Sequence, residues 1–199
     1  KAYRGTNTRI IYGDDDRFAD TSWLDNMLQC TDERPEDVIV SSGMTLENYG
    51  LTIKNQLFFP RAKRAKVKYD FDYLFRRFGQ SFLEIITNTS KTKPARCNYS
   101  SPGYVDIALG VGGVSVSPDF FDDICFDIPE ILWPEDDVWL SGNYLRQGIG
   151  IWAGNKIRFP VDSGASNTNA LAHSIINGKG RNKTAFDGIL YMQESYDIW

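Results

Sequence analysis

The feature of this sequence that most constrains its fold is a short apolar run that ends in three consecutive carboxylates. Residues 10–12 are apolar or aromatic, Gly13 permits a turn, and Asp14, Asp15 and Asp16 follow. Such a run is typical of a buried strand that ends at a turn. Adjacent carboxylates repel one another, and burying them is unfavourable unless a cation shares the site. The pattern predicts a strand end that binds a divalent metal and a diphosphate. The alternative is a solvated acidic turn, because aspartate also favours turns.

The composition is that of a globular protein. The chain has 199 residues, of which 42% are hydrophobic, and this suffices for one domain spanning residues 1–199. A net charge of -4 argues against general nucleic-acid binding. The three cysteines are widely spaced and form no CxxC pair, so we expect neither a disulfide framework nor a zinc site, but a reducing compartment and a cytoplasmic protein. No apolar run approaches the roughly 18 residues of a membrane span. We therefore expect no transmembrane segment, and a chain that is soluble or peripherally membrane-associated.

Strand and helix patterns alternate along the chain and predict an α/β fold. Apolar residues recur at helical spacing from Trp23 to Leu28, and residues 38–40 read as a short buried strand. Residues 149–152 and 157–159 are expected to form a hairpin-like pair. The segment 160–199 is expected to contain a loop and one or two helices.

Residues 57–82 form the only strongly basic stretch, and its lysines and arginines are interleaved with aromatic residues. The pattern favours a surface insertion whose aromatic side chains pack down beneath long basic ones. The alternative is a flap that meets a phosphate, an anionic acceptor or a membrane surface.

A glycine-rich stretch at residues 105–116 carries Gly110, Gly112 and Gly113 between β-branched residues. Glycines in this setting predict a strand pair that a ligand or another backbone approaches closely. The stretch matches neither the phosphate-loop fingerprint nor the dinucleotide-binding fingerprint, so neither nucleotide motif is predicted.

A second acidic motif, Glu135-Asp136-Asp137, lies at the start of a predicted helix. Carboxylates at a helix N-terminus are stabilised by the macrodipole, so a capping role alone would explain them. Alternatively, Trp133 and Trp139 would restrict the access of water and raise the pKa of a neighbouring carboxylate, as a general base requires.

Taken in order, three of these motifs resemble those of a GT-A-fold glycosyltransferase of the family 2-like type. The triplet at 14–16 resembles the DxD motif, residues 110–113 resemble a Gly-x-Gly-Gly segment, and residues 136–141 resemble Asp-Asp-x-Trp-[Ile/Leu]-Ser. The resemblance runs discontinuously from about residue 10 to 152 and implies a Rossmann-like mixed central sheet flanked by helices. Members of the family usually carry a nucleobase-binding strand and turn some tens of residues before the DxD motif, where this chain has only residues 1–13. The fold is therefore expected to be N-terminally short, with the nucleobase pocket missing or supplied elsewhere.

The resemblance implies a metal-dependent, inverting transferase that moves a sugar from a nucleotide-sugar donor to a hydroxyl of a glycan or glycoprotein acceptor. Four residues would bind the donor: Asp14, Asp15, Gly112 and Gly113. The metal would be Mn²⁺ or Mg²⁺ bound by Asp16.

The resemblance also assigns a general base and a late metal ligand. Asp136 or Asp137 would deprotonate the acceptor hydroxyl, and Asp136 is favoured slightly because it follows Glu135, as in the Glu-Asp form of the motif. His173 would be a metal ligand, as histidines are in some GT-A enzymes, although a lone histidine is more often a surface or core residue. The alternatives are a non-catalytic, glycan-binding remnant of the same fold and a metal-dependent phosphate-cleaving enzyme.

Overall fold

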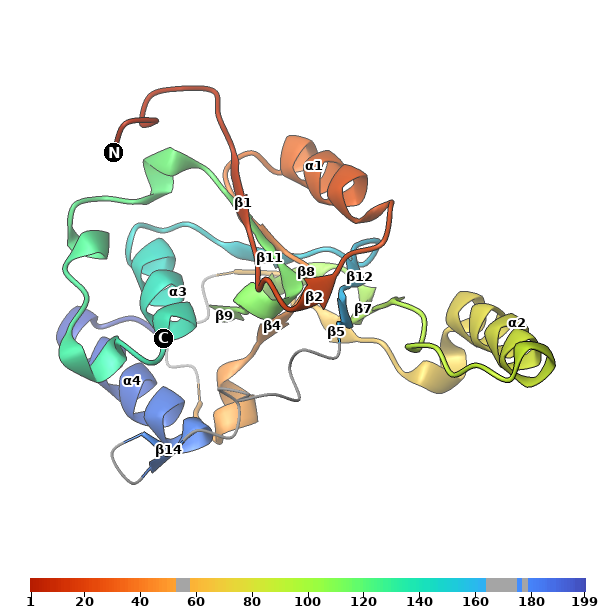
Figure 1. The fold of residues 1–199 in the computed structure, drawn as a ribbon. Coiled ribbons are helices and arrows are strands. Elements are labelled where there is room, and N and C mark those ends of the chain that lie inside the picture. Colours follow the sequence, from red (N-terminus) through yellow and green to blue (C-terminus); the bar gives the residue numbers. More distant parts are fainter. Residues whose placement is uncertain (53–57, 164–174, 177–178) are drawn as a thin grey trace.

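The computed structural model describes residues 1–52, 58–163, 175–176 and 179–199, and within them it contains a mixed five-stranded sheet with helices on both faces (Figure 1). The strand order is β1-β10-β3-β11-β8. These strands are β1 (Ile10–Tyr12), β3 (Val38–Val40), β8 (Gly103–Val105), β10 (Val114–Val116) and β11 (Ile151–Ala153). The helices are α1 (Trp23–Glu33), α2 (Phe71–Thr87), α3 (Asp136–Arg146) and α4 (Arg181–Tyr196). The predicted α/β class is confirmed.

The remaining strands are short and pair two by two. They are β2 (Arg17–Phe18) with β13 (Val161–Asp162), β4 (Gly43–Met44) with β9 (Ile107–Ala108), β5 (Lys63–Arg64) with β7 (Tyr99–Ser101), β6 (Arg96–Cys97) with β12 (Arg158–Phe159), and β14 (Ile175–Ile176) with β15 (Lys179–Gly180). Short 3-10 turns connect many of the elements, namely Leu46–Tyr49, Val67–Tyr69, Gly110–Gly112, Pro118–Phe120, Ile124–Phe126 and Glu130–Leu132.

The register of the sheet brings several strand ends to one edge. Tyr12 at the end of β1 pairs with Val114 at the start of β10, and Val114 pairs with Val40 at the end of β3. Ala153, at the end of β11, pairs with Val40 in a parallel ladder. The loops that follow β1, β3 and β11, and the loop that precedes β10, therefore all leave from the same edge. In open α/β sheets the edge at the carboxyl ends of the strands is where ligands usually bind.

Both faces of the sheet are buried, which explains why β3 is apolar throughout. Val38 and Val40 point to the face covered by α3, in a core cluster with Tyr144. Ile39 points to the opposite face and packs with Met27 of α1. α4 packs on the outer side of α3 in a third cluster of buried residues. The alternation along β3 thus fixes α1 and α3 on opposite sides of the sheet.

Several sequence-based predictions are confirmed. A strand at 38–40 and a helix beginning at Trp23 are present, and the helix extends to Glu33. A strand is also present at 10–12, but it is an edge strand with Ile10 exposed and is not the buried strand that was predicted. The C-terminal segment contains α4.

The predicted hairpin of residues 149–152 with 157–159 is wrong. β11 pairs with β3 and β8, whereas β12 pairs with β6. A central position between two strands buries β11 on both sides, and a local hairpin would leave it at the sheet edge.

The predicted packing of the basic, aromatic insertion is also wrong for its described part. α2 extends away from the body of the molecule (Figure 1), and none of its residues is buried. Phe71, Phe75 and Phe78 are each at least 74% exposed. The phenylalanines of α2 therefore do not pack down on the domain, whereas Phe58, before the helix, packs against Tyr104 of β8.

The glycine stretch differs from the predicted strand pair. β9 and β10 flank it, but Gly110–Gly112 form a 3-10 turn between them, and the two strands belong to different sheets. Gly113, with φ 87°, completes the turn into β10. The turn places the amide of Gly110 beneath the start of α3.

Candidate active site

The acidic strand end lies at the carboxyl edge of the sheet. Gly13 leaves β1 in close contact with the glycine turn, since a Cβ at Gly13 would lie 3.3 Å from the Gly110 carbonyl oxygen. Asp14 and Asp15 are exposed, and the loop is tied down where the Ser163 amide donates to the Asp16 carbonyl oxygen at 3.1 Å. The loop is thus fixed at both ends, and its first two carboxylates face solvent.

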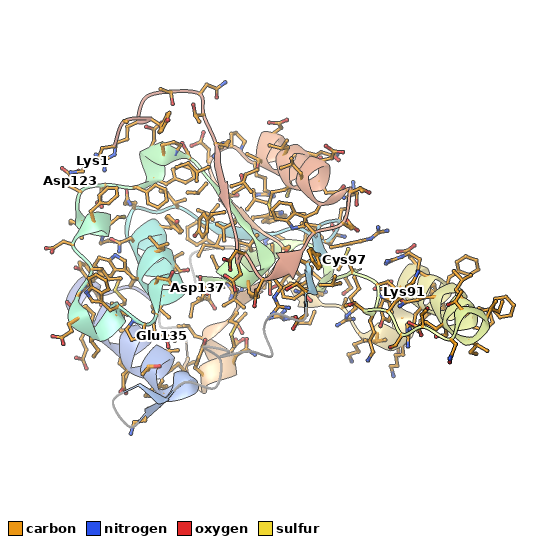
Figure 2. All side chains as sticks on the ribbon, viewed as in Figure 1. Lys1, Lys91, Cys97, Asp123, Glu135 and Asp137 are labelled. Carbon is orange, nitrogen blue, oxygen red and sulfur yellow. The ribbon has the colours of Figure 1, made fainter. Side chains whose placement is uncertain are left out.

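The second acidic motif begins α3 (Figure 2). Glu135 at the N-cap is buried and accepts a hydrogen bond from Thr184 Oγ1 of α4 at 2.6 Å. It makes no side-chain cap, so its carboxylate attaches α3 to α4. Asp136 is exposed, whereas Asp137 is half-buried and accepts from the Gly110 N–H at 2.9 Å. The three acids therefore have different surroundings, and simple capping does not describe Glu135 or Asp137.

The two acidic motifs meet at Gly110. A Cβ placed on Gly110 would lie 3.3 Å from Asp137 Oδ1 and 3.7 Å from Asp14 Oδ1. Residues 123 positions apart in the chain thus place carboxylate oxygens around one glycine, which we call the acidic corner (Asp14, Gly110 and Asp137). A side chain at position 110 would fill this space. Gly110 was not singled out as a site residue from the sequence, although it lay within the quoted glycine stretch.

Two tyrosines lie under the acidic corner. Burial raises the pKa of Tyr12 well above its ordinary value, and the charges of Asp137 and Asp136 raise it further. Tyr144 of α3 is fully buried, and burial raises its pKa as well. Both phenol groups therefore stay protonated at neutral pH, and these two side chains beneath the carboxylates are uncharged. Nothing in the sequence marks these two tyrosines, because an aromatic residue is common both at the end of a strand, as Tyr12 is, and on the buried face of a helix, as Tyr144 is.

Gly112 and Gly113 do allow a close approach, but the neighbours are parts of the same chain. The Gly112 carbonyl oxygen accepts from Ser41 Oγ at 2.6 Å and from Trp23 Nε1 at 3.3 Å. A Cβ on Gly113 would overlap the ring of Trp23. Both glycines are buried, so they pack the loop against α1 and the end of β3.

The residues that follow β1 meet some of the requirements of a site for a hard divalent cation. Asp16 Oδ1 is buried and receives no hydrogen bond within the described residues, and its ion-pair partner, Arg17 Nε, is 3.6 Å away. Within those same residues, no group of three or more His, Cys, Asp or Glu side chains converges as a ready-made metal cage. Magnesium is commonly held by one or two carboxylates together with substrate phosphates, so Asp16 fits such a partial site. His173, the other predicted ligand, lies outside the described residues.

The two tryptophans of the second motif play different roles from those predicted. Trp139 is fully buried, and its Nε1 donates to the Cys125 carbonyl oxygen at 2.9 Å. Trp133 is 69% exposed. The hydrophobic environment beside the acidic corner comes instead from Tyr12 and Tyr144.

A cavity lies apart from the acidic corner, at the base of α2. Its volume is about 820 Å³. Its lining includes two aspartates, Asp70 and Asp72, and six cationic side chains, Lys63, Arg64, Lys66, Arg76, Lys156 and Arg158. Arg158 is held by Asp20 and Asp72, and Arg76 by Asp72. This basic cleft contains none of the predicted catalytic residues.

Comparison with known proteins adds no further constraint. No family model, no curated protein and no solved structure matches the chain.

Proposed function

We propose that the chain is a metal-dependent glycosyltransferase with a GT-A-like fold, which transfers a sugar from a nucleotide-sugar donor to a hydroxyl of a glycan or glycoprotein. The observation that carries the proposal is the acidic corner, where carboxylate oxygens of Asp14 and Asp137 both lie within 4 Å of the position that a Cβ on Gly110 would take. The motif order resembles that family, and the strand arrangement is compatible with it. A transferase of this kind needs one carboxylate for the donor and one for the acceptor at adjacent positions, and the corner supplies both.

Asp137 suits the role of general base better than Asp136. The Gly110 N–H fixes one oxygen of Asp137, which orients the carboxylate, while Asp136 is exposed to solvent. In an inverting transfer the carboxylate takes the proton of the acceptor hydroxyl as its oxygen attacks the anomeric carbon. The bond from that carbon to the diphosphate oxygen breaks, and the nucleoside diphosphate leaves with the electron pair. General-base catalysis of this type contributes about 10²- to 10⁴-fold to the rate.

Asp14 and Asp16 would hold the donor. Asp14, exposed at the end of β1, would accept hydrogen bonds from hydroxyl groups of the sugar or ribose. Asp16 would hold Mn²⁺ or Mg²⁺ through the oxygen that lacks a hydrogen bond. The bound cation would neutralise charge on the departing diphosphate. Tyr12 and Tyr144 would stay uncharged beneath the site, so that they would add no negative charge to that of the carboxylates.

The test measures release of nucleoside diphosphate from a panel of nucleotide sugars with Mn²⁺. We expect Asp137→Asn to lower kcat by about 10²- to 10⁴-fold while donor binding is retained. Asp14→Asn should instead weaken donor binding. Gly110→Ala should lower kcat with little loss of stability, because its Cβ would press on Asp137 Oδ1 at 3.3 Å.

Gly79→Ala is the matched control, because a Cβ there meets nothing within 4 Å. If wild type and all variants hydrolyse simple phosphoesters equally well without any sugar donor, the phosphate-cleaving alternative replaces the proposal. If wild type neither binds nor turns over any donor, the proposal fails in favour of a non-catalytic, glycan-binding protein.

A further inference from the structure

α2 carries a continuous apolar stripe that the described part of the chain leaves uncovered. The helix has 17 residues, and the large apolar side chains recur three or four residues apart along one face. They are Phe71, Phe75, Phe78, Phe82, Ile85 and Ile86, each at least 59% exposed. A stripe of this size on a folded protein marks an interaction surface.

α2 is a complete helix with defined ends, although it lies away from the body of the molecule. Asp70 caps its start by accepting from the Tyr73 amide at 3.0 Å, and Asn88, with φ 50°, ends it. On its polar face Arg77 pairs with Glu84 at 3.2 Å. α2 is therefore a capped amphipathic helix, and none of its residues is buried against the sheet.

The charge around α2 is opposite to that of the rest of the chain. Residues 58–96 contain ten of the 22 Lys and Arg residues but three of the 26 Asp and Glu residues, whereas the whole chain has a net charge of -4. Within α2 the acids offset its two arginines, so the excess positive charge lies on the segments beside the helix. These flanking basic residues are Lys63, Arg64, Lys66, Lys68, Lys91, Lys93 and Arg96, whereas the charge of Arg61 is compensated by the buried Asp106. Three of them, Lys63, Arg64 and Lys66, also line the basic cleft at the base of the helix.

The apolar stripe and the positive charge beside it together indicate which kind of partner covers α2. A second copy of the chain would bring the same positive segments together, and its seam would consist of bulky phenylalanines, whereas helix pairs favour leucine and isoleucine at such positions. An anionic lipid surface instead attracts the flanking lysines and accepts phenylalanine side chains at the boundary between head groups and acyl chains. We propose that α2 docks this protein on anionic membranes, lying in the interface with its phenylalanine stripe inserted.

This docking surface is separate from the acidic corner. Lys91 lies in the extension with α2, on the opposite side of the molecule from Asp137 (Figure 2). The proposal does not depend on glycosyl transfer, and Asp137→Asn should leave membrane binding unchanged.

The test is co-sedimentation of the full chain with vesicles at low salt. We expect binding to vesicles of phosphatidylcholine with about 30% phosphatidylserine, weak binding to pure phosphatidylcholine, and release by 0.5 M NaCl because exposed charges are screened. Phe75→Ser with Phe78→Ser should weaken binding at least about tenfold, since two exposed phenylalanines would no longer enter the lipid. Lys63→Gln, Lys66→Gln and Lys68→Gln together should weaken it on the order of 100-fold, at about fivefold for each basic residue.

Phe18→Ser with Ile131→Ser is the matched control, because both side chains are exposed on the body of the molecule, at 63% and 46%. Circular dichroism and the unfolding midpoint show that each variant is folded before its binding is compared. The proposal is overturned if wild type fails to bind the anionic vesicles, or if the control loses binding as much as the α2 variant. It is also overturned if light scattering finds a dimer that Phe75→Ser with Phe78→Ser converts to a monomer, since a second copy then covers the stripe.

Discussion

Gly113→Ala tests whether the glycine turn serves packing, as its burial indicates, or donor binding, as the motif predicts. Gly113 has φ 87° and ψ 142°, a conformation that costs a side-chain-bearing residue about 1–3 kcal/mol. The added Cβ would also overlap the ring of Trp23, and overpacking of this kind costs about 1–3 kcal/mol. We therefore expect the free energy of unfolding to fall by about 2–6 kcal/mol.

Two further glycines separate the contributions. Gly50 also has a positive φ, 73°, but a Cβ there would meet nothing within 4 Å, so Gly50→Ala should cost only the backbone strain, about 1–2 kcal/mol. Gly79 lies within α2 with open space around it, and Gly79→Ala should be neutral or stabilising by up to about 1 kcal/mol. The difference between the Gly113 and Gly50 variants then contains the contact with Trp23 together with the difference in backbone strain, since ψ is 142° at Gly113 and 16° at Gly50.

Urea unfolding followed by tryptophan fluorescence gives these free energies, with the m-value checked for each variant. The packing account is refuted if Gly113→Ala is no less stable than Gly50→Ala. A stable Gly113→Ala protein that has lost its affinity for nucleotide sugars would instead support the donor-binding role.

Three further predictions concern ionisable groups. Asp106 is buried and pairs with Arg61 at 2.6 Å, so Asp106→Asn should lower the free energy of unfolding in urea by about 2–4 kcal/mol; an unchanged value would show that the pair contributes nothing. Burial alone would raise the pKa of Asp20, but hydrogen bonds led by that from Arg158 bring it below its ordinary value. The resulting stability is present above the unfolded pKa and is lost as pH falls through the folded one, so acid titration of Asp20→Asn should show a shallower loss between about pH 5 and 2 than wild type shows. Burial raises the pKa of Cys30 to about 11, so alkylation of this thiol by iodoacetamide at pH 8 should be at least about tenfold slower than in the unfolded chain, and an equal rate would contradict its burial.

The local sequence pattern predicted those elements whose own apolar residues show whether they are buried. Residues 38–40 read as a buried strand because both faces of β3 are covered, and the helix at Trp23 follows from apolar spacing alone. The pairing of β11 could not be predicted in the same way. Its partners are β3 and β8, and a parallel partner more than a hundred residues away leaves no turn signal in the sequence.

The sequence indicated which acidic residues belong to the candidate site, but not how they are arranged in space. The order of the acidic motifs and their resemblance to a known family pointed to Asp14 and to Asp136 or Asp137, with Asp136 slightly favoured. The hydrogen bond from the Gly110 amide to Asp137 could not be predicted, because it depends on the 3-10 turn at Gly110–Gly112. The basic, aromatic insertion was misread because the same amphipathic pattern fits a helix that packs down and one that projects; its tertiary surroundings decide between them.

The central claim is that the acidic strand end binds a nucleotide sugar through a divalent metal. Equilibrium binding of a nucleotide-sugar panel, with and without Mn²⁺, to wild type, Asp16→Ala and Asp25→Ala tests it most directly. Asp25 is an exposed aspartate in the first turn of α1 and serves as the matched control. We predict that one donor binds in a Mn²⁺-dependent manner, that Asp16→Ala weakens this binding at least tenfold, as loss of a metal ligand should, and that Asp25→Ala leaves it unchanged. Donor binding that is equal in all three proteins, or that is indifferent to Mn²⁺, would contradict the account.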